Sequence, residues 1–225
     1  MNRITTFAQY LSEYKKSIDA PEEFWAEQAE EFVWKKKWDK VLEWNFTEPT
    51  IKWFTGGKLN ITENCLDRHL AERGEQTAII WEPNDPNGTA RKFSYKELHT
   101  EVCRFANVLK NNGAKKSSRI CIYMPMVPEL AIAVLACARI GAIHSVVFGG
   151  FSASALSGRI QDSDCTIVVT TDGAYRGAKD IPMKDVVDEA LEICPSVESV
   201  IVLEHTQTNI RIIEGRDKTW KDEMS

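Results

Sequence analysis

Two segments carry residue types that could bind an anion. In the first, Gly149 and Gly150 follow an apolar run over 143–148 and precede Ser152, a good N-cap for a helix. Glycines at such a turn let a ligand approach the backbone, and the unpaired N–H groups of a helix N-terminus favour negative charge. The spacing is neither a dinucleotide fingerprint nor a phosphate loop, so a tight turn that merely needs glycine is an open alternative.

The second segment, residues 170–179, offers two cations among small side chains. Arg176 can stack on an adenine or donate a fork of hydrogen bonds to phosphate, while Lys179 supplies a point charge. A solvated surface loop is the alternative. Because both segments follow runs expected to be neighbouring strands, together they favour a nucleotide-like anion over either segment alone.

The elements that must position these segments alternate between strands and helices. The expected strands are 119–124, 143–148, 166–170 and 199–203, and the expected helices are 94–112, 128–140, 152–162 and 183–193. The strands are continuous apolar runs, which suit burial on both faces. Alternation of strands with helices predicts an α/β fold with a doubly wound, mainly parallel sheet, and such sheets bind ligands at the carboxyl ends of their strands.

The first part of the chain differs. We expect a helical arm over residues 1–60 and a second domain over 61–225, which opens with a helix over 62–73 and a hairpin of 78–81 with 91–93. Four of the seven tryptophans lie in the arm: Trp25, Trp34, Trp38 and Trp44. Helices are expected over 5–16 and 21–33, and Trp34 and Trp38 would share a face if the second helix continued. The arm docks either on its own chain or between the subunits of a homo-oligomer.

The composition excludes several classes of protein. The 225 residues carry 28 basic and 33 acidic side chains, a net charge of −5, which disfavours a nucleic-acid binder. The longest apolar stretch, 130–140, is too short to span a bilayer and contains Arg139. Residues 1–10 lack the apolar run of a signal peptide. Acidic residues in the arm disfavour a membrane-surface helix. We therefore expect a cytoplasmic protein with no membrane partner.

Cysteine and histidine give no sign of a metal site. The six cysteines are at least 16 residues apart, and most lie in apolar stretches, so we interpret them as free thiols packed in a core. A disulfide set in a secreted protein is the alternative. His69, His99 and His144 are interpreted as structural, and no pair of carboxylates has a catalytic context.

Five stretches together carry a resemblance to a known family. They are 53–60, 64–69, 123–129, 141–152 and 172–179. In combination they resemble the N-terminal part of the AMP-forming acetyl-CoA synthetases, in the adenylate-forming acyl-CoA synthetase superfamily. The resemblance covers essentially the whole chain, including the arm, and points to the short-chain acetate and propionate branch. It implies that the sheet is the N-terminal subdomain of the adenylate-forming fold.

This resemblance implies a two-step ligase reaction in the parent enzyme. Acetate and MgATP give acetyl-adenylate and pyrophosphate, and the thiol of CoA then attacks to give acetyl-CoA and AMP. The implied partners are the small molecules acetate, ATP with Mg²⁺, and CoA. Two alternatives stay open: a propionate–CoA ligase of the same family, and a non-enzymatic nucleotide-binding or interaction module.

The resemblance also assigns residues to a CoA nucleotide site. They are Phe148, Gly149, Gly150, Arg176, Gly177, Ala178, Lys179 and Ile181. The glycine turn, Arg176 and Ile181 are expected to line a pocket for the adenine, with Arg176 and Lys179 near the 3′-phosphate. Ala178 stands where relatives often carry a second glycine. Lys179 stands where some relatives carry arginine, so it keeps the charge and loses the fork.

Members of this family continue past the position of Ser225 with a Thr/Ser/Gly-rich phosphate loop, an acetate pocket and a mobile domain that holds a catalytic lysine. The chain therefore resembles a fragment with one wall of the CoA site and no catalytic, ATP-binding or Mg²⁺-binding residue. We expect it to be inactive alone.

Overall fold

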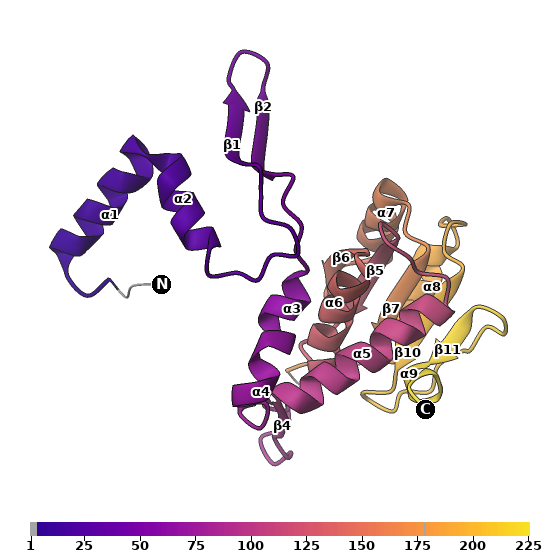
Figure 1. Cartoon of the computed structure of the whole chain (residues 1–225). Helices are drawn as coiled ribbons and strands as arrows, with labels where there is room; N and C mark the ends of the chain where they lie inside the picture. Colours follow the sequence, from indigo (N-terminus) through magenta and orange to yellow (C-terminus); the bar gives the residue numbers. More distant parts are fainter. Residues whose placement is uncertain (1–3, 178) are drawn as a thin grey trace. The chain divides into compact units, whose positions relative to one another are not determined.

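The computed structural model describes residues 4–177 and 179–225. They form two compact units, residues 1–64 and residues 65–225. Figure 1 labels the helices and strands of both. In the part of the chain that is described, no helix is both long and apolar enough to cross a membrane.

The first unit begins with two helices, α1 (Phe7–Asp19) and α2 (Pro21–Ala29). The predicted end of α2 at residue 33 is wrong. The indole N–H of Trp34 donates to the carbonyl of Ala29 (2.8 Å), and the backbone of Val33 bonds to the Asn64 side chain (2.7 Å), so the chain leaves the helix there. Trp34 and Trp38 still contact each other, with ring centroids 5.0 Å apart, although they share no helix.

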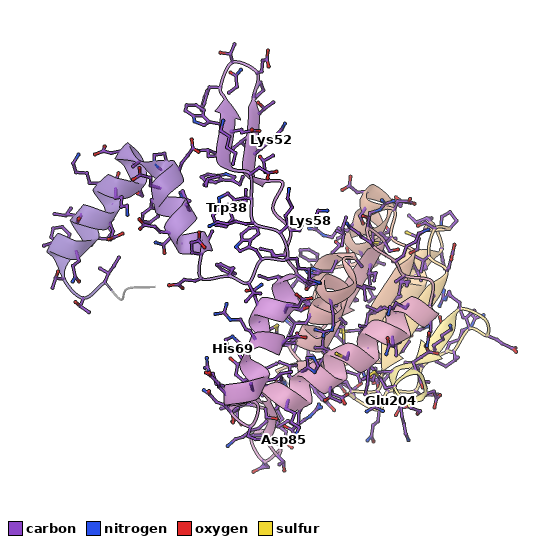
Figure 2. All side chains as sticks on the ribbon, viewed as in Figure 1. Trp38, Lys52, Lys58, His69, Asp85 and Glu204 are labelled. Atoms are coloured by element: carbon purple, nitrogen blue, oxygen red, sulfur yellow. The ribbon has the colours of Figure 1, made fainter. Side chains whose placement is uncertain are left out.

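A β-hairpin that the sequence analysis missed follows. Its strands are β1 (Lys40–Asn45) and β2 (Thr50–Thr55), which pair antiparallel; Lys52, labelled in Figure 2, lies on β2. Gly57 closes the hairpin against an aromatic cluster, because a Cβ there would lie 2.7 Å from the Trp34 ring. Aromatic packing, with rings of Trp34, Trp38 and Phe54 in mutual contact, therefore organises the first unit.

The second unit holds a five-stranded sheet in the order β11-β10-β7-β5-β6, with every neighbouring pair parallel. The strands are β5 (Arg119–Met124), β6 (Ile143–Phe148), β7 (Ile167–Thr171), β10 (Ser199–Leu203) and β11 (Asp217–Thr219). The helices are α5 (Tyr95–Asn111), α6 (Pro128–Ile140), α7 (Ala153–Ser163), α8 (Met183–Leu191) and α9 (Trp220–Glu223). The α/β, mainly parallel fold class is thus confirmed.

Alternate residues of the strands enter two separate cores. Ile120 and Ile122 pack with α5, α6 and α9, whereas Cys121 and Tyr123 pack with α7 and α8. This arrangement explains why the strands are apolar throughout, since each buried face needs its own apolar set. The predicted capping box is present: the Ser94 hydroxyl accepts the N–H of Glu97 at the start of α5 (3.2 Å).

The expected helix over 62–73 is wrong, because it is broken into three short elements. These are α3 (Ile61–Cys65), a 3-10 turn η1 (Asp67–His69) and α4 (Leu70–Arg73). Leu66 leaves the helical region at φ −123° because its side chain is buried in the core and the next residue, Asp67, accepts a two-pronged hydrogen bond from Arg139 (2.8 Å each). Tertiary contacts here override local helix propensity.

Two antiparallel ribbons complete the second unit. The predicted hairpin is present as β3 (Thr77–Trp81) and β4 (Arg91–Ser94), with Asp85 in the turn between them (Figure 2). The second ribbon was predicted as a loop, but it forms short strands β8 (Ala174–Arg176) and β9 (Lys179–Ile181).

The six cysteines are free thiols, as predicted, and four of them are buried. Cys65 is exposed and Cys103 is partly exposed, so the expectation that all pack in a core is wrong for these two. Burial raises the pKa of Cys137 to about 12 and also raises the pKa of Cys121. These two thiols are therefore poor nucleophiles at neutral pH.

Candidate functional site

A cavity of about 620 Å³ lies at the carboxyl ends of the parallel strands. The segments that follow β5, β6, β7 and β10 line it, together with the end of β3. Five predicted site residues come together in its wall: Phe148, Gly149, Gly150, Arg176 and Ile181. The strands that precede the two segments, β6 and β7, were expected to be neighbours, but β5 lies between them. Its position is where an open parallel sheet is expected to bind a ligand.

Neighbouring side chains approach the two glycines after β6 closely. A Cβ on Gly150 would lie 2.6 Å from the Phe148 ring and 3.4 Å from the Arg176 guanidinium, and one on Gly149 would lie 3.1 Å from the Met183 methyl. Neither glycine has a positive φ, so the backbone of the turn does not itself demand glycine. The Tyr123 hydroxyl holds the turn: it donates to the carbonyl of Phe151 (2.8 Å) and lies 3.2 Å from that of Gly149.

Arg176 of β8 and Lys179 of β9 are opposite each other in the register of the antiparallel ribbon. Gly177 lies at its tip, in the left-handed region (φ +61°). Arg176 lines the cavity, whereas Lys179 and Gly177 lie outside its lining. Both cations are exposed, and neither forms an ion pair with a residue that the structure describes. The predicted site residue Ala178 lies outside the described residues.

Sequence reasoning missed the aromatic side of the cavity, which is made by Trp81, Tyr175 and His205. The Trp81 indole N–H donates to the Met126 carbonyl (2.7 Å) and thereby joins the β3–β4 hairpin to the segment after β5. Arg91 lies over the Trp81 ring, 5.9 Å from its centroid. His205 could have been found, because it lies two residues past β10 and ligands bind at strand ends.

A buried carboxylate holds His205 in place. Asp172, only 1% exposed, accepts hydrogen bonds from the backbone N–H groups of Gly173 (2.7 Å), His205 (2.8 Å), Thr206 (3.0 Å) and Thr208 (3.1 Å). Glu204, labelled in Figure 2, marks where the chain leaves β10 for this segment. The result is a loop whose path over the sheet edge is fixed by one side chain.

The imidazole of His205 contacts two aromatic rings edge-on, with centroids 5.6 Å from that of Tyr175 and 6.4 Å from that of Trp81. Burial lowers the pKa of His205; Asp172 opposes this shift and Arg91 adds to it. Burial and the positive charge of Arg91 both disfavour the charged imidazolium. The net direction of these effects favours the neutral imidazole.

A second charged cluster ties α8 to β11 and to the segment after β10. The Lys184 ammonium, whose side chain is fully buried, bonds Asp188 (2.7 Å), Asp217 (2.8 Å) and the Arg211 carbonyl (3.0 Å). Arg216 bonds both aspartates. Burial acts to raise the pKa of Asp217, but hydrogen bonds from Arg216 and Lys184 outweigh it, and the pKa is lowered.

No metal centre is found in residues 4–177 and 179–225, where no group of three or more His, Cys, Asp and Glu side chains lies close enough to hold an ion. Of the histidines interpreted as structural, His99 lies 3.4 Å from Asp67 and His69 lies against the Tyr95 ring (5.3 Å). Neither lines the cavity.

Comparison with known proteins agrees with this architecture. Residues 66–223 match the family model described as AMP-binding enzyme, and residues 10–65 match that described as acetyl-coenzyme A synthetase N-terminus. A solved structure, the acetoacetyl-CoA synthetase from Streptomyces lividans, superposes with a TM-score of 0.84 at 24% identity, over 94% of this chain and 32% of that one. This superposition shows that the two share a fold.

The chain is also similar in sequence to curated proteins. The acetyl-coenzyme A synthetase of Bdellovibrio bacteriovorus is 51% identical over 96% of this chain, and that of Alkalilimnicola ehrlichii is 54% identical over 92%. The alignments cover 34% and 32% of those relatives, so the chain spans about a third of their length. On the family match over most of its length, this chain belongs to the family of AMP-binding enzymes.

Proposed function

We propose that the chain supplies one wall of the CoA nucleotide site of an acetate–CoA ligase. The ligase joins acetate and CoA at the expense of ATP, through acetyl-adenylate, and releases AMP and pyrophosphate. The observation that carries the proposal is the cavity at the strand ends, where a glycine turn and an arginine face one another. The relatives named acetyl-coenzyme A synthetase support acetate as the acid.

The roles follow from the chemistry of each group. The glycine turn leaves room for a flat adenine beside Phe148, and Ile181 offers an apolar contact. The Arg176 guanidinium is free of described ion-pair partners, so it can stack on the base or donate to phosphate. Lys179, at the exposed ribbon tip, is suited to a phosphate outside the cavity, which is the 3′-phosphate in this proposal.

We assign the adenylation step, with its acetate, ATP and Mg²⁺, to the rest of a full-length ligase. This chain would then bind CoA without turnover. Acetate-dependent exchange between ATP and pyrophosphate by the chain alone would contradict that assignment.

Arg176→Ala is expected to raise the Kd for CoA by about 10- to 100-fold, because a charge-assisted hydrogen bond contributes about 1.5–3 kcal/mol. Isothermal titration calorimetry with the 225-residue chain measures this change. Lys179→Ala should weaken CoA more than dephospho-CoA, since only CoA has the 3′-phosphate.

The matched control is Lys96→Ala, which removes an exposed lysine of α5 that does not line the cavity. Its affinity for both nucleotides should equal that of the wild type. Equal weakening of CoA and dephospho-CoA by Lys179→Ala would show that Lys179 does not read the 3′-phosphate. An unchanged Kd in Arg176→Ala would remove the proposed site.

Gly150→Ala is expected to weaken CoA at least fivefold while lowering the free energy of unfolding by only about 1–2 kcal/mol. The new methyl would displace the Phe148 ring and Arg176, and Phe148 is exposed enough to move. Gly158→Ala is the control: its Cβ meets nothing within 4 Å, and it lies inside α7, so it should stabilise by about 0.5–1 kcal/mol. Wild-type affinity in Gly150→Ala would contradict the close approach.

A further inference from the structure

The cavity contains a titratable side chain to which the proposed function gives no role. His205 lines its wall and contacts the rings of Trp81 and Tyr175. Its imidazole is half-buried, and neither ring nitrogen is hydrogen-bonded to any residue that the structure describes. A polar ring held in an apolar cavity wall with both nitrogens unpaired is available to a ligand.

The backbone of His205 is fixed more firmly than that of an ordinary loop. Its N–H is one of four donors that the buried Asp172 carboxylate accepts, so the loop cannot swing away without losing several charge-assisted hydrogen bonds. Trp81 and Tyr175 limit the ring itself, since each packs edge-on against it. These contacts therefore hold the imidazole at the wall of the cavity.

From this placement we propose that His205 makes the nucleotide affinity of the cavity depend on pH, by adding a second positive charge to that of Arg176 when the ring is protonated. The inference rests on the proposed function, because it takes the ligand to be a nucleotide with phosphate groups. Arg176 and His205 both line this one cavity of about 620 Å³, so both charges act on the same bound anion.

Several charged or titratable groups act on His205 or share its cavity, and their balance sets the direction of the effect. They are Asp172 beneath its backbone, Glu129 of α6 with its partner Arg91 of β4, and the cavity-lining Glu82, Tyr175 and Arg176. Arg91 and Glu129 form an ion pair at 2.7 Å and largely cancel one another. Without ligand, burial keeps the pKa of the imidazole below its usual value near 6.5. A bound phosphate favours the imidazolium, so binding takes up a proton.

Uptake of one proton tightens binding by at most tenfold for each unit by which the pH falls. The 3′-phosphate of CoA also titrates near pH 6, so the ligand contributes its own pH dependence. Comparing variants with the same ligand cancels that contribution. His205→Gln keeps a polar side chain that does not titrate, and His205→Lys carries a charge at every pH in the range.

The test is calorimetric titration of the 225-residue chain with CoA at pH 5.5, 6.5 and 7.5. We expect the ratio of Kd at pH 7.5 to Kd at pH 5.5 to be at least threefold larger for the wild type than for His205→Gln. His205→Lys should bind more tightly than the wild type at pH 7.5. Equal ratios for wild type and His205→Gln would overturn the inference and leave the CoA site standing.

A second measurement needs no variant. The ¹⁵N chemical shifts of the His205 ring, followed against pH, give its pKa with and without CoA, and we expect the pKa to rise when CoA is bound. An unchanged pKa on a saturated protein would overturn the inference. Failure of CoA to bind the wild type at any pH would overturn the proposed function itself, and the inference with it.

Discussion

Lys184→Ala is expected to lower the free energy of unfolding of the second unit by about 3–5 kcal/mol. The Lys184 side chain is fully buried and bonds two aspartates and a backbone carbonyl, so its removal leaves buried negative charge with Arg216 as the remaining cation. Chemical denaturation followed by circular dichroism measures the change. The largest loss should come from the contacts between α8 and β11 that this ammonium joins.

Two further variants separate the charge network from a general loss of packing. Lys96→Ala removes an exposed pair with Glu75 and should change the free energy of unfolding by less than about 0.5 kcal/mol. Lys184→Met with Asp217→Leu removes a cation and an anion together, and it should cost less than the sum of the two single changes. Additive costs would show that the two groups do not depend on each other.

Asp172→Ala is expected to cost at least about 3 kcal/mol, because it removes the acceptor of four backbone N–H groups at once, and the carboxylate that they bind is itself buried. It should also release the segment that carries His205, so amide exchange at His205, Thr206 and Thr208 should accelerate together. Loss of the Asp172 charge removes an interaction that raises the pKa of His205, so that pKa should fall further.

Asp172→Asn is the matched control. The amide oxygen of asparagine can keep the bonds that one carboxylate oxygen makes to Gly173, His205 and Thr206, while the bond to Thr208 is lost. We therefore expect a smaller loss of stability and selective exchange at Thr208. Equal destabilisation by alanine and asparagine would mean that the carboxylate acts through charge rather than through these donors.

The parallel sheet was predictable because its signals are local. Apolar runs predicted β5, β6 and β10 at their observed bounds, and Pro128 with Gly141 predicted both ends of α6. The missed elements depend on distant partners. The β1–β2 hairpin is fixed by aromatic packing, and the β8–β9 strands have only three residues each, too few for a periodic signal.

The candidate site also has residues that the sequence could predict and residues that it could not. The glycine turn and Arg176 carry recognisable residue types at strand ends, and they do lie in one cavity wall. Trp81 contributes because a hairpin brings it to Met126, 45 residues further along the chain, and no local pattern encodes that contact. The position of Lys179 outside the lining also depends on the register of a ribbon that had been predicted as a loop.

The order of strands in the sheet has a consequence for how the protein is made. β5 and β6 pair with each other first along the chain; β7 then joins the free side of β5, β10 joins β7, and β11 joins β10. Every strand after β6 thus adds to the same open edge, in the order in which the ribosome releases it. In this sheet no later strand has to be inserted between two that are already paired. The second unit can therefore add one strand at a time to a single edge as the chain emerges during translation.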